Sequence, residues 1–313
     1  MALNEFLHKI ETHPLSPEAW QTIFNNTKAN ADQVLKQYHD RLSINFIKPD
    51  LCENKDREKV NAHAKKISHL NYEISVYPKM IEALRRYSWL VASYKDIFKS
   101  LPETNEIRTK MADNLMYMWL DFIFWHEFFH ITLGHLELLE PHTTLFEFTL
   151  NAKELSEDEL WFFRTLEGEA DAYASRMTFT RFNGYKHSLN KLVCPDYSER
   201  DMCCDFFLGL NFFFGLFETL RNKECIQRTH PLPAERNFIV QSFLPEVDNA
   251  ILKKISLNKD ELAQLVSHAF IKHESFMGEK EEDIVMRLKK SMEFSIIADK
   301  YRKEINRRRK MLI

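Results

Sequence analysis

The sequence predicts a mainly helical α+β fold with a small edge sheet and extra helices at both ends. Only six glycines occur among 313 residues, against 25 phenylalanines, which favours long helices and few tight turns. Most of the chain carries apolar residues at helical spacing, whereas two short stretches, 43–48 and 72–77, alternate polar and apolar side chains as strands do. A sheet this small must pack on the helices to bury its apolar face.

The N-terminal segment, residues 1–70, combines one helix with a short strand. The Ser16-Pro17 pair supplies an N-cap and a first-turn proline, so a helix is expected from there towards His39. Residues 43–48 predict a weak strand, and the charged stretch 50–66 is interpreted as a solvated loop or a short helix. We expect this segment to pack on the rest of the chain.

Residues 72–77 predict an edge strand that Pro78 ends, before helical spacing returns in residues 80–98. An edge strand in this position could add a peptide substrate to the sheet. It could equally serve only to cover the core, and the alternation of side chains does not decide between the two.

The stretch His126-Glu127-Phe128-Phe129-His130 has the HExxH pattern and lies in the apolar run 115–133. A capping box at 100–103 is expected to open this helix. Positions i and i+4 share one helical face, so His126 and His130 can bind one ion, for which Zn²⁺ is the natural choice. Glu127 stands where the general base of a hydrolase belongs. The alternative is a buried helix with two incidental histidines.

Gly134 is expected to end this helix, and His135 follows it directly. The offsets of these two residues from His126 do not match the metzincin pattern, in which a glycine and a third histidine ligand follow HExxH. We therefore interpret His135 as a helix-end histidine near the last carbonyls rather than as a metal ligand.

A second capping box at residues 156–159 begins a helix that is expected to reach about Thr180. Glu167 and Asp171 are four residues apart and share a face of this helix, whereas Glu169 points elsewhere. One carboxylate from a second helix would complete a His₂Glu zinc site, and a following aspartate would orient a ligand histidine. A solvated acidic face is the alternative, but small residues around the pair favour close helix packing.

Beyond this helix, residues 206–217 form an apolar stretch that is too short to cross a bilayer and predicts a buried helix. The turn 229–236 holds His230 between constraining prolines and leads into another helix. His230 could stabilise the oxyanion of a tetrahedral intermediate, with Arg236 assisting it or anchoring the turn. The alternative for His230 is a solvated surface turn.

The C-terminal extension, residues 246–313, predicts two helices over 248–271 and 279–310. The basic run 302–310 is interpreted as a solvated helix end, with contact to an acidic partner or RNA as the alternative. The helices are expected to pack on the core through apolar residues at helical spacing: Ile251, Ile255, Leu262, Leu265, Ile284, Leu288, Met292 and Ile296.

Composition excludes several classes of protein. The formal charge of -3 predicts no general attraction to nucleic acid. Residues 1–10 lack the apolar run of a secretory signal, and no stretch calls for a membrane. Five cysteines without CxxC spacing predict reduced thiols, with Cys203-Cys204 as buried packing rather than a redox or metal pair. We therefore expect a cytoplasmic protein.

Three elements taken together, HEFFH, EGEAD and THPLPAER, resemble a gluzincin-type zinc metallopeptidase, and in particular the Lit phage-exclusion peptidase family, over Tyr72–Phe243. This resemblance implies a zincin-like catalytic core over 71–245, Zn²⁺ as cofactor, and a metalloendopeptidase that cleaves a cytosolic protein in phage exclusion or abortive infection. It implies a translation factor similar to elongation factor Tu as substrate, and a phage-derived activator. Carried over by position, it implies these roles: metal ligands His126, His130 and Glu167, catalytic residues Glu127 and His230, supporting residues Asp171 and Arg236.

Two other functions stay open. A regulatory peptidase similar to ImmA/IrrE would cleave or sequester a repressor, but such proteins usually carry a DNA-reading helix or a partner, and no convincing DNA-reading helix is seen in this sequence. A non-catalytic zinc-binding protein would keep the metal without the chemistry. Glu127 argues against the latter, because a structural zinc site has no use for a base there.

Overall fold

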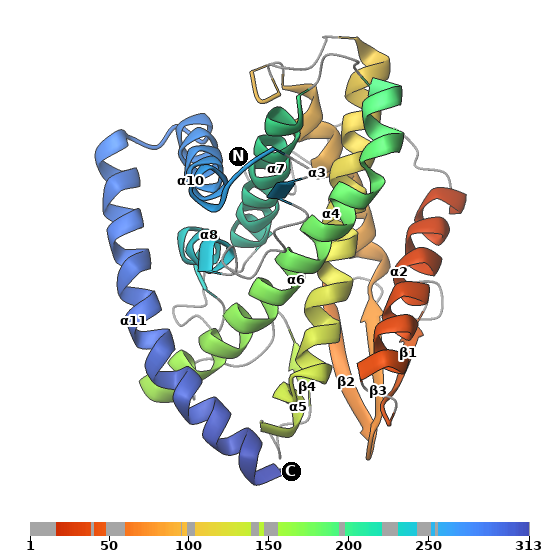
Figure 1. Cartoon of the computed structure of the whole chain (residues 1–313), viewed down its shortest axis with the longest axis vertical. Coiled ribbons are helices and arrows are strands. Elements are labelled where there is room, and N and C mark those ends of the chain that lie inside the picture. Colours follow the sequence, from red (N-terminus) through yellow and green to blue (C-terminus); the bar gives the residue numbers. More distant parts are fainter. Residues whose placement is uncertain are drawn as a thin grey trace.

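The computed structural model agrees with the mainly helical α+β prediction. Its helices are joined to one small sheet, and helices α4 and α6 lie at the centre of the molecule (Figure 1). The structure describes these residues: 17–38, 41–47, 60–94, 96–98, 104–138, 144–146, 156–193, 198–220, 231–242, 252–253 and 256–312.

The helices follow the predicted order, with several boundaries moved. The N-terminal helix and the helix after Pro78 form as expected, although the latter ends at Ser93 rather than near Phe98. The bounds are α2 Pro17–Tyr38, α3 Pro78–Ser93, α4 Asn105–Thr132, α5 His135–Leu138, α6 Glu157–Val193, α7 Glu199–Leu220, α8 Pro233–Ser242, α10 Lys259–Phe276 and α11 Glu281–Leu312.

The strands of the described residues form one sheet in the order β1 (Ser43–Ile47), β3 (Asn71–Val76), β2 (Ala62–Ser68), β4 (Thr144–Phe146). β1 pairs with β3 in parallel, and β2 pairs antiparallel with both β3 and β4. The prediction of β3 as an edge strand is therefore wrong, because strands pair with both of its sides. The prediction of a loop or helix up to residue 66 is also wrong, since β2 begins at Ala62.

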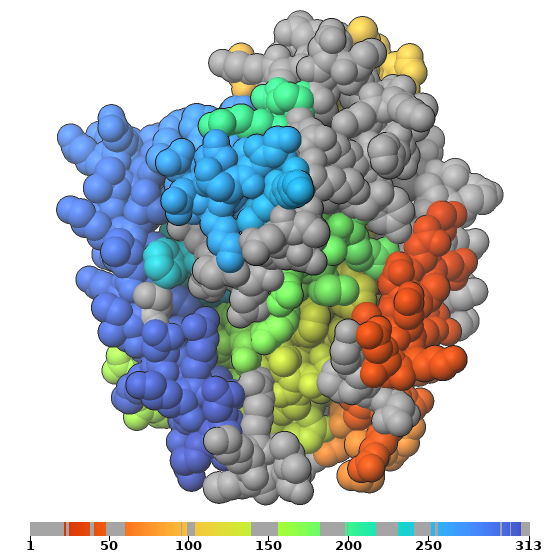
Figure 2. All heavy atoms as spheres, viewed as in Figure 1, coloured from red at the N-terminus to blue at the C-terminus, as the bar shows by residue number. Residues whose placement is uncertain are grey.

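From Leu115 onwards, helix α4 is buried on nearly all sides, as the apolar sequence of this part requires. It packs against α3 and α6, against β2 and β3, and against α7. In Figure 1, α2 and the sheet lie on one side of α4 and α6, and α10 and α11 lie on the other. Figure 2 draws all atoms as spheres in the same view, and atoms in the colours of α4 and α6 are visible at the surface between α2 and α11.

The start of α4 differs from the prediction. The helix begins at Asn105, and the side chain of its N-cap, Thr104, accepts a hydrogen bond from the Ile107 amide at 3.3 Å. The capping box predicted at 100–103 lies outside the described residues. In α6, by contrast, the box at 156–159 forms as predicted: Ser156 accepts from the Glu159 amide at 3.3 Å, and the Glu159 carboxylate accepts from the Ser156 amide at 2.8 Å.

Helix α7 is the buried apolar helix that the sequence predicts, and it forms the wall behind α4. The Trp119 indole donates to the Gly209 carbonyl at 2.9 Å, and a Cβ at Gly209 would lie 2.6 Å from the end of Met118. Cys203 and Cys204 lie on this helix as free thiols, the first of them buried. Within the described ranges, no helix combines the length and apolarity that a bilayer crossing needs.

The C-terminal helices correct two further predictions. α10 begins at Lys259 behind a capping box formed by Asn258 and Glu261, not near residue 248. Met292 and Ile296 are 58% and 73% exposed, so they do not pack on the core. Ile284 on α11 and Leu262 and Leu265 on α10 are buried as predicted, and Leu288 is partly buried. In place of Met292 and Ile296, α11 turns Phe294, Ala298 and Ile305 inward. Ile251 and Ile255 lie outside the described residues.

Two glycines at helix ends adopt positive φ, Gly134 at 71° and Gly278 at 83°. A Cβ at either position would meet only ordinary contacts or open space, so backbone strain alone should set the effect of a substitution. We expect Gly134→Ala and Gly278→Ala each to lower the free energy of unfolding by about 1–2 kcal/mol. Urea unfolding would measure both, and an unchanged stability in either variant would contradict this account.

Candidate metal centre

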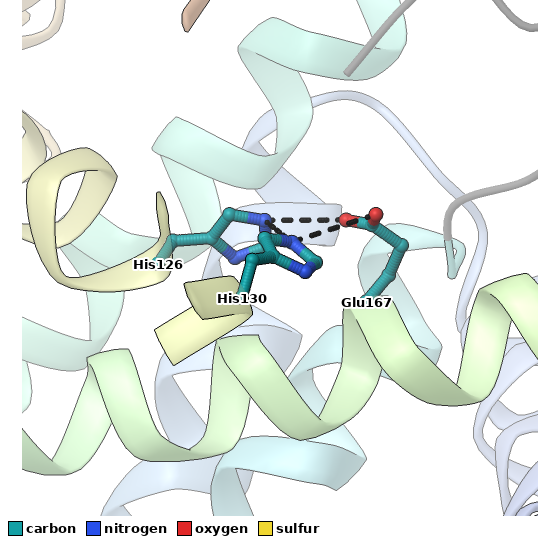
Figure 3. Close-up of side chains that lie close together, drawn as sticks. All are labelled: His126, His130 and Glu167. Carbon is teal, nitrogen blue, oxygen red and sulfur yellow. Dashed lines mark hydrogen bonds and ion pairs between the residues drawn. The ribbon is translucent and has the colours of Figure 1, made fainter. Parts of the chain in front are cut away.

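Helices α4 and α6 bring three ligand groups together in the interior. His126 and His130 lie one turn apart on α4, and Glu167 faces them from α6 (Figure 3). One ligand atom from each residue lies within 4.8 Å of the others, and the exposed fractions of the three residues are 1%, 1% and 3%. The two imidazoles and the carboxylate therefore converge on one buried point, as the sequence predicted.

The distances between these atoms suit a tetrahedral metal ion. The Nε2 atoms of His126 and His130 are 2.9 Å apart, and the Glu167 carboxylate oxygens lie 3.2 Å and 3.5 Å from them. Zinc bonds of about 2.0–2.1 Å at a tetrahedral angle separate two ligand atoms by about 3.3 Å. The three groups could therefore hold one zinc ion.

The outer nitrogen of His126 faces a carboxylate on the same helix as Glu167. Nδ1 of His126 lies 3.0 Å from Oδ1 of Asp171, which is fully buried. Arg236 of α8 reaches the same oxygen with Nη1 at 3.4 Å, and its guanidinium also lies over the ring of Phe214. Asp171 therefore stands where a residue that orients a zinc-binding histidine should stand, and Arg236 anchors Asp171.

The outer nitrogen of His130 faces a second histidine. His135 is fully buried at the start of α5, with its Nδ1 2.9 Å from Nδ1 of His130 and its Nε2 3.0 Å from Oε2 of Glu169. The interpretation of His135 as a helix-end histidine near the last carbonyls is wrong. The sequence gives no comparable signal for Glu169, because residues two apart on a helix point in different directions.

Helix α8 reaches the site because α6 carries a glycine where the two helices cross. A Cβ at Gly168 would lie 2.8 Å from Cδ1 of Ile239 on α8. Because Gly168 has no side chain, Ile239 of α8 can pack closely against the turn of α6 that carries Glu167 and Asp171. This close approach brings Arg236 to Asp171.

Burial and neighbouring charges shift the two histidines in opposite directions. Burial lowers the pKa of His126, but its hydrogen bonds to Asp171 and Glu167 outweigh burial, and the net pKa lies well above its usual 6.5. Burial dominates at His130 and lowers its pKa to about 4, although Glu167 opposes this. His130 is therefore neutral at neutral pH, which is the form that binds a metal ion.

Comparison with known families decides the class of protein. The sequence model of one family, described as peptidase U49, matches residues 47–252, which is more than half of the chain. The chain belongs to the peptidase U49 family. It is therefore a protease, and the matched range contains the converging groups of α4 and α6. No curated protein and no solved structure matches the chain.

The remaining site residues of this U49 peptidase are placed as follows. Glu127 follows His126 on α4 and is 2% exposed. Arg236 is 3% exposed and lies on Asp171, as described above. His230 lies outside the described residues, so its role in stabilising an oxyanion stays a prediction.

Proposed function

We propose that this U49 peptidase is a zinc-dependent endopeptidase of the gluzincin type. The observation that carries the proposal is the convergence of His126, His130 and Glu167 on one buried point, with Glu127 next to the first of them. Two imidazoles and one carboxylate are the donor set of many catalytic zinc sites. Thiol ligands would indicate a softer metal and an all-oxygen set a harder one, and neither occurs in this cluster.

Each side chain then has a distinct task. A bound zinc ion would act as a Lewis acid that lowers the pKa of water and polarises the scissile carbonyl. Glu127 takes the proton of the attacking water on its carboxylate and later gives it to the leaving amine. Asp171 orients His126, Arg236 holds Asp171 in place, and His230 donates a hydrogen bond to the oxyanion.

The biological role that we propose comes from the resemblance to the Lit family. The substrate is a cytosolic protein, with a translation factor such as elongation factor Tu as the first candidate. Cleavage would serve phage exclusion or abortive infection and would begin when a phage-derived component activates the peptidase in the cytoplasm.

The proposal is tested on the purified full-length chain. We expect about one zinc per chain by elemental analysis. We also expect fragments of elongation factor Tu on incubation with a lysate of phage-infected cells, fewer with an uninfected lysate, none after chelation, and recovery when zinc is returned. A protein without zinc would overturn the metal assignment. A zinc-loaded protein that cleaves neither this factor nor any other protein in the infected lysate would indicate a non-catalytic zinc-binding protein.

A further inference from the structure

We propose that His135 and Glu169 are positioning residues that hold His130 in the tautomer and orientation needed to bind the metal ion. This inference rests on the proposed function, because it concerns how the same site is prepared. The paired histidines and the acidic residue come from three elements, α4, α5 and α6, so the arrangement belongs to the fold and not to one local sequence.

The hydrogen-bond chain has one consistent direction when a metal ion is present. The Nε2 atom of His130 must offer its lone pair to the ion, so the proton of this neutral imidazole lies on Nδ1. Across the 2.9 Å contact, Nδ1 of His135 must then accept that proton, and the proton of His135 lies on Nε2. There it donates to Oε2 of Glu169 at 3.0 Å.

The carboxylate selects this direction. An ionised Glu169 can only accept, so it favours the proton of His135 on Nε2 and leaves Nδ1 of His135 as an acceptor. The opposite tautomer of His135 would place two N–H groups against each other at 2.9 Å or push the proton of His130 onto its metal-binding nitrogen. Glu169 therefore acts on the metal site through His135 without touching the ion.

The position of His135 is fixed from its other side by the sheet. Gly134, with φ of 71°, turns the chain sharply after α4, so that α5 brings His135 back towards His130. Glu137 on α5 accepts a hydrogen bond from the hydroxyl of Tyr72 on β3. Lys66 on β2 lies 3.7 Å from the same carboxylate. The short helix α5 is thus held to two strands while it presents His135 to the site.

Both ligand histidines consequently end on a carboxylate of α6, by different routes. His126 reaches Asp171 directly, at 3.0 Å, whereas His130 reaches Glu169 through His135. Partners of this kind usually contribute about 10–100-fold to metal affinity. Glu167, Glu169 and Asp171 would therefore serve a single ion together, one as a ligand and two as supports.

The test measures the zinc dissociation constant of the full-length chain by competition with a chromophoric chelator. We expect His135→Ala to weaken binding by about 10–100-fold and Glu169→Ala to weaken it in the same direction. His135→Asn should recover most of the affinity, because an amide oxygen near the place of Nδ1 can accept from His130. Equal affinities of wild type and His135→Ala would overturn the inference, as would an asparagine variant no better than alanine.

A matched control separates positioning from general loss of stability. His273 on α10 is also buried and also has a carboxylate partner, with Nδ1 2.9 Å from Oε1 of Glu274, but neither residue belongs to the metal cluster. His273→Ala should leave zinc affinity unchanged. If His135→Ala does not fold, Glu169→Ala decides alone. Wild type that binds no zinc would refute the proposed function, whereas zinc binding that ignores both substitutions would refute only the positioning role.

Discussion

Replacing Glu127 with glutamine is expected to abolish peptide cleavage while zinc stays bound. Glutamine has nearly the same shape as glutamate but cannot take a proton from water at neutral pH. General-base catalysis usually contributes about 10²–10⁴-fold to the rate, so the cleavage rate of the variant should be lower than that of wild type by at least about 100-fold. The three groups that converge on the metal position remain in the variant, so its zinc content should match that of wild type.

The measurement combines initial cleavage rates with elemental analysis of the same protein samples. Glu106→Gln is the matched control, since Glu106 lies on the same helix, α4, with its side chain 76% exposed. That control should cleave at the wild-type rate. Undiminished cleavage by Glu127→Gln would end the assignment of Glu127 as the base, and loss of zinc would show that Glu127 supports the metal instead.

The convergence of the metal ligands could be predicted because it depends on local geometry. Residues four apart on a helix share a face whatever the rest of the chain does, which places His126 with His130 and Glu167 with Asp171. The apolar surroundings of both pairs predict that their helices are buried and packed together. These two properties favour packing in which the histidine face of α4 meets the carboxylate face of α6. In the structure, the ligand atoms of His126, His130 and Glu167 lie within 4.8 Å of one another.

The contribution of His135 and Glu169 could not be predicted in the same way. Their contact depends on the direction in which the chain leaves Gly134, on the hold of the sheet on α5, and on the angle at which α6 crosses α4. None of these is a property of a short sequence window. The motif comparison that excluded His135 tested only whether it binds the metal itself, and not whether it binds a ligand.

The same limit explains the errors in the fold. Strand β2 carries an exposed Lys65 and a partly exposed Lys66 in its second half, so its sequence looks like a charged loop, while Ala62 and Ala64 in its first half are fully buried. The alternating side chains of β3 predict a strand but do not show how many strands pair with it, so its place between β1 and β2 is not apparent from its sequence. For α11, apolar residues occur on more than one face, and only packing against α8 and α6 decides which face is buried.

Removing Glu167 is expected to weaken metal binding more than removing a residue that only orients a ligand. Structural zinc sites with four ligands bind with about 10–16 kcal/mol, which corresponds to roughly 2.5–4 kcal/mol for each ligand. Glu167→Ala should therefore weaken zinc binding by about 10²–10³-fold, since each 1.4 kcal/mol is about a factor of ten. Because an ion that binds only the native state raises its stability, zinc should raise the Tm of wild type and have little effect on the variant.

Zinc binding by Asp171→Asn provides the control that distinguishes a metal ligand from a residue that only orients one. Both carboxylates are buried on one face of α6 and both face His126, Glu167 at Nε2 and Asp171 at Nδ1. A residue that only orients a ligand should contribute about 10–100-fold, so Asp171→Asn should bind zinc more tightly than Glu167→Ala. Asparagine can still accept from Nδ1 of His126, which favours the same order. If the order were reversed, Asp171 and not Glu167 would be the third ligand, and the geometry of the proposed site would have to be rebuilt around it.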